Sequence, residues 1–143
     1  MDPIISAESA AAFDELTRSN RDDLIRRQDK NFWPNGFRSS RFVPAVEYIN
    51  ANRHRYTLIT ALNDFMKNYD IIIVPSFAGS QLAITNLTGN PVVCMPIGMN
   101  ANGRPNSITL IGNLYDEATL LAVAKAYQDA TGFNKVHPEK FKQ

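Results

Sequence analysis

The stretch that decides the fold runs from Ile71 to Tyr115 and holds three short apolar segments. These segments are Ile71-Ile-Ile-Val74, Val92-Val-Cys-Met-Pro-Ile-Gly98 and Ser107-Ile-Thr-Leu-Ile111. The one charged residue of the stretch is Arg104. Because charged side chains are rarely buried without a partner, so little charge predicts an interior segment. Runs of Val and Ile ended by Pro and Gly are typical of strands covered on both faces, and we expect this chain to supply only one of the two covering layers.

The length and composition predict a single domain of the α/β class spanning residues 1–143. We expect a small mixed β-sheet of about three strands, including a hairpin, covered by helices. The predicted order is a helical and loop entry at 1–43, a long helix at 44–69, the sheet strands at 70–115, a last helix at 116–132 and a polar tail at 133–143.

Turn residues place the connections of the predicted sheet. Asn102-Gly103 is a strong hairpin signal and makes the third strand antiparallel to the second. The segment 75–80 reads as a turn or loop. Asn86-Leu-Thr-Gly-Asn-Pro91 predicts a tight connector in which Gly89 can adopt positive φ. Gly132 marks the end of the last helix, whose expected inward residues are Leu120, Leu121, Ala124 and Tyr127.

The N-terminal part predicts two short helices and a loop. The first helix is expected at 6–16, with Ala10, Phe13 and Leu16 on one side. Asn20 suits the N-cap of a second helix, which should end near Lys30 and expose its alternating charges to solvent. The Pro, Asn and Gly of residues 31–37 indicate a loop, whose three large aromatics favour packing; a surface binding loop is the alternative.

Pro44 opens the long helix, because a proline in the first turn loses no hydrogen bond. The apolar residues recur at helical spacing on one face, and they are Ala45, Ile49, Tyr56, Ile59, Leu62 and Met66. We expect His54, between two arginines of this helix, to lie on the surface.

The charge of the chain argues against several partners. A net charge of +1, with bases interleaved among acids, predicts neither nucleic-acid binding nor attraction to an acidic membrane surface. The single cysteine, Cys94, excludes an internal disulfide and fits a reducing compartment. No signal peptide and no membrane-spanning run is evident, so we expect a cytoplasmic protein and discount the glycosylation sequon at Asn86.

Residue types alone indicate no complete catalytic site. Cys94 with His54 or His137 is a conceivable nucleophile and base, but a small buried hydrophobe is the expected role of Cys94. Two distant histidines and one cysteine give no metal-binding spacing, and the glycines form no phosphate-binding loop. We therefore expect no metal and no cofactor.

A series of short motifs, each weak alone, resembles amidase-signature enzymes when taken in order. The motifs are Arg38-Ser-Ser-Arg-Phe42, Pro44-Ala-Val-Glu-Tyr-Ile49, Ala51-Asn-Arg53, Tyr69-Asp-Ile-Ile-Ile-Val-Pro75, Asn86-Leu-Thr-Gly-Asn-Pro91, Met95-Pro-Ile-Gly98, Gly103-Arg-Pro-Asn-Ser107 and Gly112 with Asp116–Gln128. The chain looks like the C-terminal third of such an enzyme, and the resemblance runs from about residue 6 to residue 138.

The resemblance implies amide hydrolysis or transfer in an intact enzyme with an α/β/α fold. In that family a lysine acts through a bridging serine on a nucleophilic serine, and all three lie upstream of the matched region. No Gly-Gly-Ser-Ser-like stretch is present here, so no catalytic residue carries over. The resemblance places the loop 77–88 nearest the acyl-side pocket, with Phe77, Asn86 and Thr88 as candidate substrate-binding residues.

Two interpretations follow from the resemblance. The chain is the C-terminal portion of an amidase-signature hydrolase, inactive alone and able to act on a small amide only when completed. Alternatively, it is a non-enzymatic relic or interaction module that self-associates through an uncovered sheet face. Either way we expect apolar surface open to a partner, which is a second copy or a separately encoded N-terminal amidase fragment.

Overall fold

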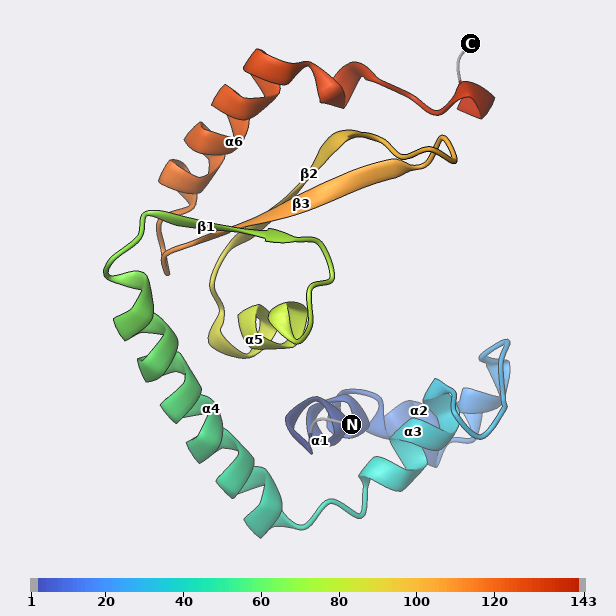
Figure 1. Cartoon of the computed structure of the whole chain (residues 1–143). Helices are drawn as coiled ribbons and strands as arrows, with labels where there is room; N and C mark the ends of the chain where they lie inside the picture. The colour runs from blue at the N-terminus through green and yellow to red at the C-terminus, as the bar shows by residue number, and fades with distance from the viewer. Residues whose placement is uncertain (1–2, 142–143) are drawn as a thin grey trace. The chain divides into compact units, whose positions relative to one another are not determined.

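A computed structural model describes residues 3–141, which form helices and one three-stranded sheet (Figure 1). The α/β class is confirmed. The chain divides into two compact units, Met1–Tyr56 and Thr57–Gln143, and helix α4 (Ala45–Met66) runs through the division. The expectation of a single domain stays a prediction, and each unit is described by itself.

The sheet of the second unit has the order β1-β3-β2. Strand β3 (Pro105–Gly112) lies in the middle and pairs antiparallel with both β1 (Ile71–Pro75) and β2 (Val92–Met99). The three expected strands and the hairpin are therefore confirmed. The expected mixed sheet is wrong for the described strands, because the hairpin reverses β2 into β3 and β1 also runs opposite to β3.

Asn100 closes the β2–β3 hairpin, whose loop contains the predicted Asn102-Gly103 turn. The side chain of Asn100 accepts hydrogen bonds from the backbone N–H groups of Asn102 and Arg104, at 2.9 and 3.0 Å. Gly103 has φ +69° in this loop, a conformation that favours glycine. The turn therefore fixes which residues of β2 and β3 face each other.

Helix α6 (Glu117–Thr131) packs on one face of the sheet and forms the core of the second unit. The buried side chains of this core are Met95, Leu110, Leu120 and Ala124. The helix approaches the sheet closely at Gly112, where an added Cβ would lie 3.2 Å from Leu120 Cβ. Three of the four expected inward residues face this core, whereas Leu121 is 58% exposed and that prediction is wrong.

Both ends of α6 follow the local signals of the sequence. Asp116 at the N-cap accepts hydrogen bonds from the backbone N–H and the hydroxyl of Thr119. Gly132 takes the left-handed conformation at the C-cap, as predicted. Two 3-10 turns follow, η2 (Phe133–Lys135) and η3 (Glu139–Phe141). The Phe133 ring packs over Gly98 of β2, which ties η2 to the sheet.

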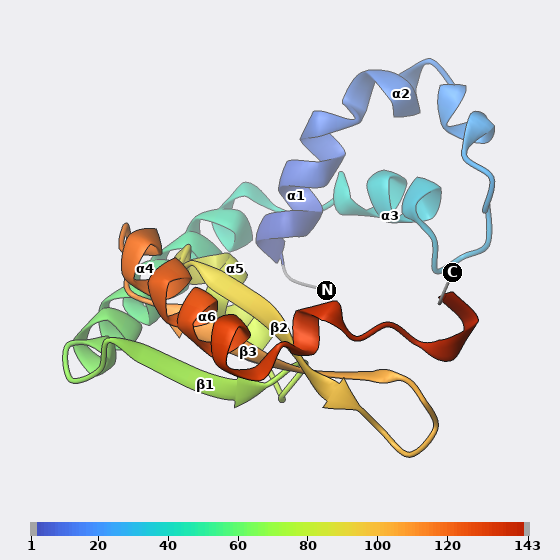
Figure 2. The same cartoon turned by 90° about the horizontal axis from the view of Figure 1, so that it is seen from above.

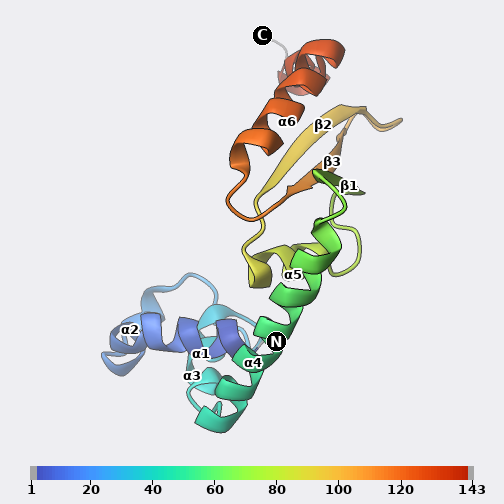
Figure 3. The same cartoon turned by 90° about the vertical axis from the view of Figure 1, so that its left-hand side faces the viewer.

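Helix α5 (Gln81–Thr88) lies on the opposite side of the sheet from α6, as Figures 1 and 3 show. The expected loop 77–88 and the expected connector from Asn86 to Pro91 are therefore largely helical, and this is a correction. Gly89 ends this helix in the left-handed conformation at φ +83°. The real connector is short, and buried Asn90 anchors it by donating to the Gly112 carbonyl at 3.0 Å.

In the first unit, the expected helix at 6–16 is broken at Phe13 into α1 (Pro3–Ala12) and α2 (Asp14–Arg18). No proline or glycine marks the break. The Phe13 ring stacks on Phe37 at 4.8 Å, and Asp14 forms ion pairs with Arg18 and Arg41. Tertiary contacts therefore coincide with a break that the local sequence does not signal.

The expected helix from Asn20 to Lys30 is wrong. A 3-10 turn, η1 (Arg21–Leu24), replaces it, and Asn20 has φ +55° without capping through its side chain. Asp22 is fully buried in an ion pair with Arg38, so its charge is not on a solvated helix face. The Gln28 amide donates to the carbonyls of Asp22 and Ile25, each at 2.8 Å, and satisfies groups that a longer helix would have used.

The expected loop at 31–37 is also wrong, because most of it forms helix α3 (Trp33–Ser40). Pro34 lies in the first turn, where its missing N–H costs no hydrogen bond. Phe37 is buried, as the packing interpretation expected, whereas Trp33 is 56% exposed. Helices α1 and α2 pack against α3 (Figure 2).

Helix α4 confirms the predicted long helix with slightly shorter bounds. Of its predicted apolar face only Met66 is fully buried, and Ile49 and Tyr56 are 50% and 72% exposed. His54 is exposed, as expected. The helix therefore presents an apolar stripe that the described residues leave largely uncovered.

Candidate functional site

The turn after β1 carries Phe77, one of the predicted substrate-binding residues. Phe77 is 82% exposed and has φ +62°, in the left-handed region that bulky side chains avoid. Such strain persists only where the surrounding structure imposes it, and it is concentrated at functional sites. Phe77 therefore fits a residue held out toward a ligand or a partner.

The other two predicted substrate-binding residues lie in α5 and differ from each other. Asn86 is exposed. Thr88 is buried, and its hydroxyl donates to the Ile84 carbonyl at 3.0 Å, so it is already used within the helix. A substrate-binding role for Phe77, Asn86 and Thr88 stays a prediction, and the geometry favours the first two.

The sheet face opposite α6 carries a cluster of three polar side chains, Ser76, Cys94 and Thr109. Cys94 on β2 pairs in register with Thr109 on β3, and Ser76 directly follows β1. The Ser76 hydroxyl lies 3.3 Å from Cys94 Sγ and 3.1 Å from Thr109 Oγ1. Cys94 is exposed, so the expectation of a buried hydrophobe is wrong: its strand position turns it to the face without α6.

Hydrogen bonds from neighbouring hydroxyls change the pKa of the Cys94 thiol. The Ser76 hydroxyl lowers the pKa of Cys94 below that of a free thiol, partial burial opposes this, and Ser107 and Thr109 add smaller lowering contributions. Hydroxyl donors favour the charged thiolate over the thiol. The cluster therefore favours the thiolate form of Cys94 relative to an isolated cysteine.

The structure does not give Cys94 a catalytic base. The hydrogen-bond partners of Cys94 in the described part of the chain are hydroxyls, and neither His54 nor His137 is among them. A nucleophilic cysteine needs a base or cation within hydrogen-bond reach. The pairing of Cys94 with His54 or His137 that the sequence suggested is therefore not formed among residues 3–141.

Sequence reasoning missed the Ser76–Cys94–Thr109 cluster, although one signal could have found it. Counting outward from the Asn102-Gly103 turn places Cys94 close to Thr109 on the neighbouring strand. The contribution of Ser76 depends on the pairing of β1 with β3, which no local signal specifies.

Two further results limit the chemistry. Within residues 3–141 no group of three or more His, Cys, Asp or Glu side chains is arranged to hold a metal ion. None of the described helices combines the length and apolar character needed to cross a membrane.

Curated relatives of this chain are amidases and components of amidotransferases. The matching component of the glutamyl-tRNA(Gln) amidotransferase of Brevibacillus brevis is 27% identical over 94% of this chain and 32% of its own length. The putative amidase AmiD of Mycobacterium bovis is 29% identical over 67% of this chain and 25% of its own length. The chain thus spans a third or less of these relatives. No family model matches it.

Solved structures share the fold. The 6-aminohexanoate cyclic dimer hydrolase superposes with a TM-score of 0.68 over 97% of this chain and 37% of its own, at 15% identity. An amidase family protein from Bacillus anthracis superposes with a TM-score of 0.67 over 88% of this chain and 25% of its own, at 19% identity. In sequence and in fold, the chain therefore resembles the C-terminal portion of amidase-signature proteins.

Proposed function

We propose that this chain is the C-terminal portion of an amidase-signature hydrolase and forms one wall of its acyl-side pocket. The observation that carries the proposal is the relatives' match, which extends over 94% of this chain but only 32% of the first relative. The lysine and two serines of the chemistry belong to the part of the enzyme that this chain does not match. The substrate class is a small amide.

The second sheet face supports a role at such a wall. The hydroxyl and thiol groups of the Ser76–Cys94–Thr109 cluster lie there, and the exposed, strained Phe77 directly follows Ser76 in the chain. An apolar side chain next to a few polar groups is the composition of small-molecule sites. Asn86 of α5 completes the candidate set.

The proposed partner is the complementary N-terminal amidase portion, and self-association is the alternative. Exposed apolar side chains on the sheet and α4 support both, since Ile73 is 61% and Phe65 is 53% exposed. A patch of this kind usually marks an interface. The net charge of +1 gives no reason to expect transfer RNA as a partner. A cytoplasmic location is part of the proposal.

Activity assays on the purified chain test the proposal. We expect no hydrolysis of aliphatic, aromatic or fatty-acyl amides by the chain alone, and turnover after addition of the N-terminal portion of an amidase-family relative. Turnover by the chain alone, blocked by iodoacetamide and lost in Cys94→Ser, would overturn it and make Cys94 the nucleophile.

Light scattering separates the proposed partner from the alternative. A chain that is monomeric alone and forms a one-to-one complex with the N-terminal portion supports the hydrolase proposal. A stable homo-oligomer that does not bind the N-terminal portion and does not hydrolyse an amide supports an interaction module instead.

A further inference from the structure

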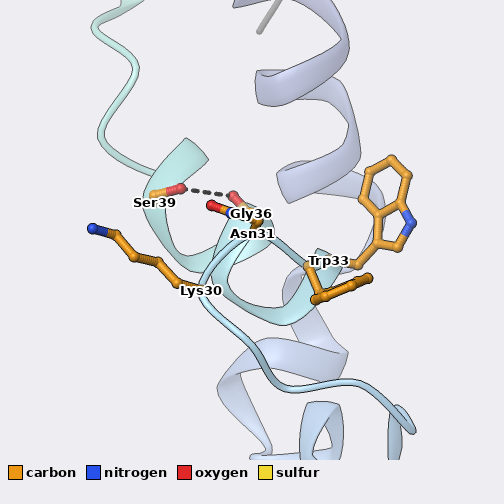
Figure 4. A pocket seen from close by; sticks show the side chains of 6 residues that line it. Lys30, Asn31, Trp33, Gly36 and Ser39 are labelled. Atoms are coloured by element: carbon orange, nitrogen blue, oxygen red, sulfur yellow. Dashed lines mark hydrogen bonds between the residues drawn. The ribbon is translucent and has the colours of Figure 1, made fainter.

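A hollow in the first unit lies at the start of α3, apart from the residues of the proposed hydrolase wall. It is partly open, has a volume of about 510 Å³ and is lined by Lys30, Asn31, Phe32, Trp33, Gly36 and Ser39. This volume falls in the range of small-molecule sites. Figure 4 shows Lys30, Asn31 and Ser39 to one side of Gly36 and the Trp33 indole to the other.

Gly36 has no structural role that the described residues explain. It lies inside α3, where a glycine costs about 1 kcal/mol of helix stability relative to alanine. It is not among the glycines with positive φ, and an added Cβ would meet no atom within 4 Å. Gly36 lines the hollow, and its missing side chain leaves space free beside the helix.

The polar groups of the hollow suit an anion. Lys30 forms no ion pair with any described residue, and the Asn31 side chain makes no hydrogen bond among them. The Ser39 hydroxyl donates to the Gly36 carbonyl at 3.1 Å and keeps its acceptor lone pairs. No carboxylate of the described residues lines the hollow. An unpaired ammonium group beside a free amide favours a carboxylate ligand.

The aromatic groups suit a planar ring on the same ligand. Phe32 and Trp33 both line the hollow, and Trp33 is 56% exposed although its ring also contacts Phe37 at 5.6 Å. The Arg27 guanidinium lies 3.8 Å from the Phe32 ring centroid, so a second positive charge contacts this aromatic ring. Offset stacking on exposed aromatic rings is favourable beyond the area that it buries.

We propose that this hollow binds a small aromatic carboxylate, with the ring against Trp33 and Phe32 and the carboxylate at Lys30 and Asn31. The proposal does not depend on the hydrolase function, because it concerns residues of the first unit and makes no use of catalysis.

Fluorescence of the single tryptophan tests it directly, since that residue is Trp33. The full chain is titrated with 3-phenylpropionate, with 3-phenylpropanol as the neutral ring control and with propionate as the ringless control. We expect a saturable change with 3-phenylpropionate that weakens with added salt, and at most a weak response to either control.

Two variants sharpen the test. Lys30→Gln should weaken binding about threefold, because an exposed charge contact is a modest one, whereas the matched surface variant Lys135→Gln should leave it unchanged. Gly36→Leu should abolish binding by filling the hollow while keeping or raising the melting temperature, since leucine is the better helix former. A melting temperature that is unchanged or higher shows that a loss of binding is not caused by unfolding.

Equal responses to the acid and the alcohol, or full binding by Gly36→Leu, would overturn the proposal. A Trp33 emission that does not change with 3-phenylpropionate but changes with protein concentration would overturn it as well, because the hollow would then be a contact between copies of the chain.

Discussion

The two compact units of this chain are stabilised by different interactions. In the second unit, α6 and the sheet bury Met95, Leu110 and Leu120, each at most 2% exposed. In the first unit, the largest buried groups include a carboxylate, Asp22, which is paired with Arg38 across η1 and α3. The second unit is built on an apolar core, whereas the first unit buries Ile4, Ala10 and Phe37 together with one charged group, Asp22.

The difference matters because the two kinds of interaction respond differently to change. Burial of apolar surface is roughly proportional to area and tolerates small shifts. A buried carboxylate must keep its cation, because an unpaired buried charge is strongly destabilising. Apart from the ion pair with Arg38, the Asp22 carboxylate has no hydrogen-bond partner among residues 3–141. The first unit is therefore the one whose stability should depend on keeping a charged pair intact.

Leu110→Ala tests the apolar side of this comparison and should have the largest effect. Removing a buried leucine side chain should lower the free energy of unfolding by about 3 kcal/mol, through lost burial and a residual cavity. Urea denaturation followed by circular dichroism measures the change. The control is Leu121→Ala on α6, a 58% exposed leucine whose loss should change stability by less than about 0.5 kcal/mol.

Arg38→Met tests the charged side, with a loss of about 2 kcal/mol, because it strands the fully buried carboxylate of Asp22. Removing the charge of the other partner, in Asp22→Asn, should lower the free energy of unfolding by only about 1 kcal/mol, because the Arg38 side chain is 44% exposed and water can solvate it. The same urea experiment compares the two. Equal losses, or a larger loss for Asp22→Asn, would show that the buried charge does not govern this unit.

Ser76→Ala tests the polar Ser76–Cys94–Thr109 cluster of the second unit. Removing the hydroxyl that most lowers the pKa of Cys94 should raise that pKa and slow alkylation of the thiol by iodoacetamide at neutral pH. The pH–rate profile of alkylation measures the shift. Ser80→Ala is the control, because Ser80 is exposed and forms no capping hydrogen bond with its side chain. An unchanged profile in Ser76→Ala would remove Ser76 as the cause.

Asp14 should give the smallest effect, because its ion pairs with Arg18 and Arg41 are solvent-accessible. The Arg18 hydrogen bond is the main cause that lowers the pKa of Asp14, against a smaller effect of burial, and Arg41 adds to the lowering. A lowered folded-state pKa adds stability above the unfolded value, about 3.9, and the gain is lost as pH falls through the folded value. Asp14→Asn should therefore melt slightly lower than the wild type at neutral pH and equally at strongly acidic pH.

The second unit could be predicted well because its signals are local. Proline and glycine end the strands, Asn102-Gly103 fixes the hairpin, and Asp116 and Gly132 cap α6. The predictions that were wrong there are the mixed sheet, the buried Cys94, the loop through α5 and the inward Leu121. A short apolar segment ended by glycine allows both a loop and a helix, and packing selects between them.

The candidate sites could be predicted only in part. Phe77 and Asn86 were expected from the resemblance, whereas the Ser76–Cys94–Thr109 cluster requires β1 to pair with β3 across more than 30 residues. The hollow at Gly36 lies in a segment that composition alone assigned to a loop. Both depend on contacts between segments that sequence spacing does not fix.

The sequence by itself determined the strands, the hairpin, the long helix and the caps of the last helix, because apolar periodicity and turn residues act on neighbours along the chain. Only the tertiary structure decided the N-terminal helices. There Asp22 points inward to Arg38, and Phe13 interrupts a helix where its ring stacks on Phe37. Such contacts join residues distant in sequence, so no local pattern of residue types specifies them.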